Sequence, residues 1–142
     1  MDSRIEVRGG EAVNTTDLGS GGGAGGSIKI KAQRIEGNGK IDISGGRGSK
    51  GGGGGGSGGY LKVQFLHSYL LTHEKSNWWG TLINEGGKKG LMTIDHKYYQ
   101  GRAQDGQPGF IALPDCYGGQ SGPFCEFCPI GTFKYNYGSS TC

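Results

Sequence analysis

The alternation of apolar and polar positions predicts short β-strands. Ile28 and Ile30 are separated by lysines, and Leu61 and Val63 flank Lys62 in the same way. A period of two is typical of a strand that has one buried face. The intervening residues 36–39 read EGNG, which predicts a turn because Asn and Gly tolerate positive φ. We therefore expect an all-β chain.

Two short motifs recur along the chain. Residues 4–10 read RIEVRGG, and residues 40–46, which lie 36 positions later, read KIDISGG. Residues 81–87, TLINEGG, form a weaker third copy. The segment GGSIKIK at 25–31 returns as GGYLKVQ at 58–64, 33 positions later. Each repeat unit therefore contains a glycine-rich segment and two short strands.

One such unit cannot bury its apolar stripe alone, whereas stacked units bury it as a ladder. The expected fold is a short Gly-rich β-solenoid, either a parallel β-helix of pectin-lyase type or a β-roll, over residues 1–99. A linker at 100–109 and a small disulfide-rich module at 110–142 follow. An antiparallel meander remains the alternative, because the pattern does not give strand direction. The glycine runs at 21–26 and 51–59 could be loops, mobile segments, or close-packed extended segments where only glycine fits.

Composition and charge exclude several classes of partner. The 142 residues include 33 glycines, and the net charge is +3, which is small for a disordered chain. Basic residues are interleaved with acidic ones, so no nucleic-acid partner is expected. No apolar run approaches the ~18 residues of a membrane span. The N-terminus lacks the apolar region of a signal peptide, and the chain stops at Cys142 within a cysteine pattern. We interpret it as a piece of a longer protein.

The four cysteines lie close together near the C-terminus, at Cys116, Cys125, Cys128 and Cys142. An even number of clustered cysteines in a short glycine-rich tail predicts disulfides. Zinc is the main rival, since zinc modules often contain two close cysteine pairs. Only Cys125 and Cys128 form such a pair, and the tail contains no histidine. We expect no metal ligands here.

The cysteine spacing resembles two extracellular modules. Cys116-x8-Cys125, with glycine and an aromatic residue inside, looks like the closing loop of an EGF-like domain. Residues 125–133, CEFCPIGTF, followed by Cys142, resemble the ephrin-receptor-like cysteine-rich repeat. That repeat is related to growth-factor-receptor and tumour-necrosis-factor-receptor modules, and its usual form is C-x2-C-P-x-G-T-[YF] followed by C-x2-C. The final C-x2-C is cut off here.

The whole layout is similar to large surface proteins of ciliates and other protists. In that family, Gly-rich repeats of pectin-lyase-like character precede ephrin-receptor-like cysteine repeats. The resemblance implies a membrane-associated, extracellular position and no activity. It also implies that Cys116 pairs with Cys125 and Cys128 with Cys142, one of three possible pairings. Only the cysteine motif carries over residue by residue.

No catalytic or cofactor site is expected. A G-x-G-x-x-G string at 21–26 precedes a strand rather than a helix, so it lacks the context of a dinucleotide site. The RGG-like segments at 8–10 and 46–48 are too few for an RNA-binding arm. Glu6 and Asp42 occupy matching repeat positions, and we interpret them as a solvated strand face rather than a catalytic pair. The three histidines, which have no defensible partner, are His67, His73 and His96.

The expected function is a non-catalytic structural or interaction region of a larger extracellular surface protein, with an unknown protein or glycan as partner. One alternative is a binding module that uses exposed Trp78, Trp79, Tyr98 and Tyr99, although the Trp pair is expected to pack against the core. A second alternative is a degraded β-helix carbohydrate-active enzyme. Asn14 begins an N-T-T sequence, which is a glycosylation acceptor if the chain is secreted.

Overall fold

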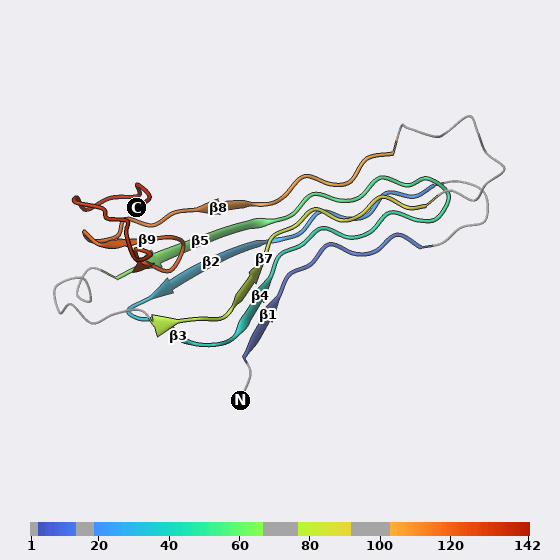
Figure 1. Cartoon of the computed structure of the whole chain (residues 1–142). Helices are drawn as coiled ribbons and strands as arrows, with labels where there is room; N and C mark the ends of the chain where they lie inside the picture. The colour runs from blue at the N-terminus through green and yellow to red at the C-terminus, as the bar shows by residue number, and fades with distance from the viewer. Residues whose placement is uncertain (1–2, 14–18, 67–76, 92–102) are drawn as a thin grey trace.

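The computed structural model describes residues 3–13, 19–66, 77–91 and 103–142 (Figure 1). These residues form short strands and no helix, so the all-β prediction is confirmed. The strands are β1 (Arg4–Glu6), β2 (Ser27–Ala32), β3 (Glu36–Gly37), β4 (Lys40–Asp42), β5 (Tyr60–Phe65), β6 (Asn77–Trp78), β7 (Thr81–Ile83), β8 (Phe110–Ala112), β9 (Gln120–Ser121) and β10 (Glu126–Phe127).

Strands from equivalent positions of successive repeats pair in parallel. β1, β4 and β7 form one sheet, β2, β5 and β8 form a second, and β3 pairs with β6. In the first sheet, Ile5 stands beside Ile41, which stands beside Leu82. In the second sheet, Ile28 stands beside Leu61. These are the registers of the two sequence motifs, and their parallel direction rules out the antiparallel meander.

The apolar faces of the two larger sheets share one core. In β5, Leu61, Val63 and Phe65 are buried, while the residues between them are exposed. Ile41 and Ile43, at β4 and just after it, belong to the same buried cluster. Burying a Val or Leu side chain contributes roughly 1.5–3 kcal/mol. Strand alternation therefore places a narrow apolar core between the sheets.

Beyond the strands, the glycine runs continue as long extended segments side by side (Figure 1). Three leave the first sheet and form the outgoing layer, and three lead into the second sheet and form the returning layer. We number them as rows in chain order. Row 1 consists of residues 7–12 and 20–26, row 2 of residues 43–49 and 53–59, and row 3 of residues 84–90 and 103–109.

Within each layer, hydrogen bonds between rows recur at every third residue. The Gly9 N–H donates to the Ser44 carbonyl, and the Ala12 N–H donates to the Arg47 carbonyl, both at 2.9 Å. Three residues per turn is the period of the polyproline II helix, which makes no internal hydrogen bonds and leaves its backbone groups free for neighbours. The outgoing and returning segments are therefore polyproline II-type rows rather than strands.

A ladder of glycine hydrogen bonds joins the two layers. Each step is 2.7–2.9 Å long and crosses from one layer to the other, alternately within one row and between neighbouring rows. The steps run from Gly106 N–H to Gly87, Gly87 to Gly56, Gly56 to Gly46, Gly46 to Gly23, and Gly23 to Gly10. A Cβ on Gly46 would overlap the carbonyl of Gly10, and one on Gly87 would overlap that of Gly46. Of the three interpretations of the glycine runs, the one that the structure shows is close-packed extended segments.

The prediction of a linker at residues 100–109 is wrong for the part that the structure describes, residues 103–109. Residues 103–109 form the returning segment of row 3, where the Gln104 and Gln107 carbonyls accept hydrogen bonds from Gly55 and Gly58 at 2.9 and 2.8 Å. β8 then pairs with β5, so the repeat region extends through Ala112. Glycine and proline suit both a linker and a polyproline II segment, which is why composition alone was misleading.

The disulfide module lies at the end of the strands opposite the glycine rows (Figure 1). Disulfides join Cys116 to Cys125 and Cys128 to Cys142, which is the pairing that the resemblance implies. Phe124 is fully buried, and its ring lies 4.1 Å from that of Trp78, centroid to centroid. The module therefore closes this end of the core.

Candidate functional site

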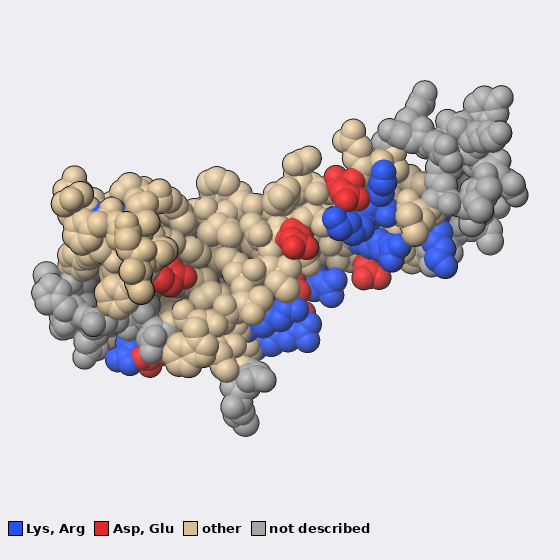
Figure 2. All heavy atoms as spheres, in the orientation of Figure 1, with Lys and Arg blue, Asp and Glu red and all other residues tan. Residues whose placement is uncertain are grey.

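A charged groove of about 670 Å³ follows the outgoing layer, where β4 passes into row 2. Lysine and arginine side chains gather over this region with carboxylates between them (Figure 2). The groove is lined on the row 1 and row 2 side by Arg8, Lys40 and Asp42, and on the row 3 side by Lys88 and Asp105. Because the repeat stacks equivalent positions, charges far apart in the sequence meet here.

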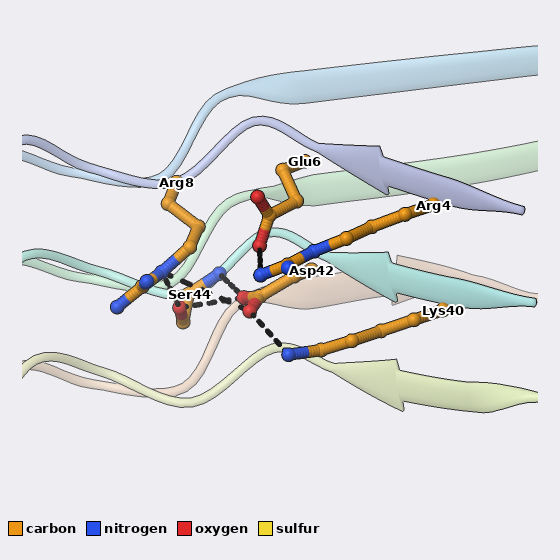
Figure 3. Close-up of polar contacts among 6 residues, drawn as sticks. All are labelled: Arg4, Glu6, Arg8, Lys40, Asp42 and Ser44. Atoms are coloured by element: carbon orange, nitrogen blue, oxygen red, sulfur yellow. Dashed lines mark hydrogen bonds and ion pairs between the residues drawn. The ribbon is translucent and has the colours of Figure 1, made fainter. Parts of the chain in front are cut away.

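Asp42 is at the centre of the most connected polar cluster (Figure 3). Its Oδ1 accepts hydrogen bonds from the Ser44 hydroxyl at 2.6 Å and the Ser44 N–H at 3.1 Å. Its Oδ2 lies 3.2 Å from Lys40 Nζ and 3.7 Å from Arg8 Nε. Arg8 Nε also donates to the Ser44 hydroxyl at 3.2 Å. The cluster therefore joins row 1 to row 2.

Opposing effects act on the pKa of Asp42. Burial raises it, while hydrogen bonds from Ser44, followed by the hydrogen bond and charge of Lys40, lower it. The net result is a pKa below the ordinary value of an aspartate. Asp42 is therefore ionised at neutral pH. A glycosidase general acid needs a raised pKa instead, so Asp42 is suited to hold cations in place.

Glu6 and Asp42 stand side by side in the β1–β4 register, as their repeat positions imply. Glu6 forms its ion pair with Arg4, whereas Asp42 pairs with Lys40 and Arg8. Asp42 is only 3 % exposed. The expectation that it lies on a solvated strand face is therefore wrong, because Ser44 and two cationic side chains surround its carboxylate.

A second charged cluster joins the two segments of row 3. Asp105 accepts a hydrogen bond from the Lys89 N–H at 2.9 Å and one from Lys88 Nζ at 3.1 Å. These hydrogen bonds, with the Lys89 N–H first, lower the pKa of Asp105. The carboxylate thus binds a backbone donor that would otherwise point outward from row 3.

The aromatic residues divide between core and surface. Trp78 packs against the core and Phe124, as expected, but Trp79 is 63 % exposed. On the outer face of the second sheet, the rings of Tyr60 and Phe110 stack with centroids 5.8 Å apart. This pair was not predicted from the sequence, although both residues occupy polar-face positions of aligned strands.

Several residues from the sequence analysis lie outside the part of the chain that the structure describes. They are Asn14, His67, His73, His96, Tyr98 and Tyr99.

The chemistry available elsewhere is limited. All four cysteines form disulfides, so none offers a thiolate to zinc. Within residues 3–13, 19–66, 77–91 and 103–142, no group of three or more His, Cys, Asp or Glu side chains could hold a metal ion. The same residues contain no helix that could span a membrane. The arrangement supports packing and surface contact.

The Asp42 cluster was missed by sequence reasoning, although a signal exists. In KIDIS, Lys40, Asp42 and Ser44 alternate with isoleucines, so all three side chains fall on one face of the extended chain. Comparison with protein-family models, with curated proteins and with solved structures finds no match for this chain.

Proposed function

We propose that this chain is a non-catalytic structural and interaction region of an extracellular surface protein. Its repeat region acts as a short β-solenoid whose polyproline II rows form a stiff platform, and the disulfide module covers one end of the core. The observation that carries the proposal is the glycine ladder, in which backbone groups bond within a layer and across layers. Such a network of backbone hydrogen bonds keeps the repeat region rigid without a large apolar core.

The rows depend on glycine at positions that face another backbone. Gly22 faces the Gly46 carbonyl, and Gly25 faces the Ile43 carbonyl, so an added Cβ would overlap either oxygen. The same requirement explains why only glycine fits the crowded axis of collagen. A sequence under this constraint specifies a rigid scaffold and leaves the outward positions free to vary.

The two disulfides support an oxidising, extracellular compartment. The module contains few fully buried side chains, among them Phe124 and Cys116. Closing a loop of about 15 residues stabilises a fold by roughly 3 kcal/mol in the chain-entropy model. We infer that the module needs both disulfides. The resemblance to protist surface proteins suggests a membrane-associated parent and a protein or glycan partner.

A binding role is the second candidate, and the exposed aromatic residues favour it. Tyr60 and Phe110 stack on the outer sheet face, and Trp79 is exposed. Flat rings on a rigid strand can contact a sugar or protein surface with little loss of conformational freedom. A degraded enzyme receives less support, since Glu6 and Asp42 are each bound to cations.

The proposed location is tested by expressing the chain through a secretory pathway and counting free thiols by mass spectrometry, with and without reduction. We expect no free thiol and two linked peptide pairs, Cys116 with Cys125 and Cys128 with Cys142. Four free thiols in the folded, secreted protein would contradict the proposal. A Tyr60→Ser, Phe110→Ser double variant on a glycan array then tests the binding candidate, since loss of a captured glycan would support it.

A further inference from the structure

Hydrogen bonds within each layer have a single direction. An N–H of row 1 donates to a carbonyl of row 2, as from Gly9 to Ser44, and an N–H of row 2 donates to row 3, as from Gly45 to Glu85. The returning layer follows the same rule, with Gly22 donating to Gly54. The outer edge of row 1 therefore presents acceptors, and the outer edge of row 3 presents donors.

The acceptors on the outer edge of row 1 have no donor among the residues that the structure describes. The register makes Arg8 and Glu11 equivalent to Ser44 and Arg47, whose carbonyls accept from row 1. In the returning layer, Gly21 and Ala24 are equivalent to the acceptors Gly54 and Ser57. None of these four row 1 carbonyls accepts a hydrogen bond from the described residues. They repeat every third residue, as in the rows that are paired.

Gly10 supplies an independent observation. Its equivalents Gly46 and Gly87 must be glycine, because each lies against the carbonyl of the preceding row. A Cβ on Gly10 would meet nothing within 4 Å. Row 1 thus keeps a glycine at a position where the described chain does not need one. A further row on this side would place a carbonyl there.

The opposite edge, on row 3, is blocked at two of its four donor positions. At the positions of the donors Gly55 and Gly58, row 3 has Asp105 and Pro108, and proline has no N–H. In the outgoing layer, the Lys89 N–H already donates to Asp105 Oδ1. Proline and a charged side chain are common devices for blocking the edge of a sheet. Of the four donor positions, only the Gly86 and Asp105 N–H groups donate to none of the described residues.

This asymmetry identifies the occupant of the open edge. A second copy docked edge to edge through row 1 would oppose acceptors to acceptors. A second copy docked head to tail would present Pro108 and the occupied Lys89 N–H at two of the four donor positions. We propose that the row 1 edge binds a glycine-rich segment of a partner chain, in polyproline II conformation and with N–H donors at every third residue. This inference goes beyond the proposed function and does not depend on where the protein is located.

The strand end of the same edge suits a strand that extends such a segment. Ile5 and Val7 are exposed on β1 and just after it. A hollow of about 400 Å³ beside them is lined by Ile5, Ile30, Ile35 and Trp78. An apolar strand of the partner would lie against β1 on this side, as β4 does on the other. The partner is therefore expected to combine glycine runs with alternating apolar residues.

The test uses the full chain and a synthetic peptide of residues 38–65, which reproduces row 2 with its donors. The amide resonances of the 15N-labelled chain are followed during titration, with shifts expected at Gly10 and along row 1. Gly10→Ala should weaken binding by at least about tenfold, because its Cβ would meet the peptide carbonyl, while the fold persists. Gly54→Ala is the matched control, since its Cβ stays 3.6 Å from the nearest atom, away from this edge. A Gly55→Ala peptide should not bind.

The peptide is also tethered to the N-terminus by a flexible linker, which supplies a millimolar effective concentration. Absence of any change at the Gly10 amide in the tethered protein would overturn the proposal. So would equal binding by the Gly10→Ala protein. Concentration-dependent dimerisation without peptide, lost in Gly10→Ala, would show that a second copy occupies the edge instead.

Discussion

At the residue scale, identical glycines differ in what they do. Gly46 lies against a neighbouring backbone on the inside of the array, whereas Gly54 has its nearest atom, the Gln104 carbonyl oxygen, at an ordinary 3.6 Å from an added Cβ. Sequence alone does not separate them, because both lie in long glycine-rich stretches. The physical difference is whether a backbone oxygen occupies the volume that a Cβ would fill.

This difference predicts opposite outcomes for two matched substitutions. Gly46→Ala should destabilise the fold by about 3 kcal/mol or more, because two backbones must separate. Gly54→Ala should be neutral or stabilising by up to about 1 kcal/mol, since alanine restricts the unfolded chain. Urea unfolding followed by circular dichroism measures both. Equal destabilisation would contradict the packing described.

Asp42 predicts a dependence of stability on pH. Its pKa is lowered in the folded state, so its contribution is present above its unfolded pKa of about 3.9 and is lost as the pH falls through the folded pKa. Asp42→Asn should cost about 1.5–3 kcal/mol at pH 7, the range for hydrogen bonds to charged groups. The difference in unfolding free energy between the variant and the parent should become smaller below pH ~4. A stability difference that does not change with pH would show that the carboxylate charge of Asp42 does not contribute to stability.

At the element scale, the sequence predicted the strands better than the glycine rows. The Ile5–Ile41 and Ile28–Leu61 registers follow from the two motifs. The rows could not be read, because a period of three leaves little trace in the glycine runs at 21–26 and 51–59. Residues 103–109 were misplaced as a linker, because glycine and proline suit both a linker and a polyproline II segment. The Asp42 cluster needed the register between rows before its partners could be named.

The conformation of the rows predicts where proline is tolerated. Proline fixes φ near the polyproline II value but removes an N–H. Gly54→Pro should retain stability, because the Gly54 N–H bonds to none of the described residues. Gly58→Pro should be strongly destabilising, since it removes the bond to Gln107 and adds atoms against Asn84. Thermal unfolding distinguishes them, and a large loss in Gly54→Pro would argue against the conformation.

At the scale of the whole molecule, the disulfide module and the repeat region share a core. Phe124 joins Leu61 and Val63 in one buried cluster and packs on Trp78. The glycine rows project from the other end of the strands (Figure 1). The sequence predicted both parts and the disulfide pairs, but not their contact. In that contact, Phe124 and the Cys116–Cys125 disulfide belong to the buried cluster of the repeat region.

Phe124→Ala should therefore affect both parts of the molecule. Removing a fully buried phenylalanine costs about 3–5 kcal/mol, and the cavity would lie between the module and the end of β5. We expect a shifted Trp78 fluorescence maximum and faster amide exchange in β5, with both disulfides intact. Phe133→Ala, an exposed aromatic in the same module, is the control and should leave β5 unchanged.

Amide hydrogen exchange, read by NMR for individual glycines, tests the central claim most directly. The account predicts slow exchange at Gly23, Gly46, Gly56 and Gly87, whose N–H groups form the ladder between the layers. It predicts fast exchange at Gly54, which has no such bond to the described residues. Uniformly fast exchange across all of these glycines would show that the rows are loops and would contradict the account.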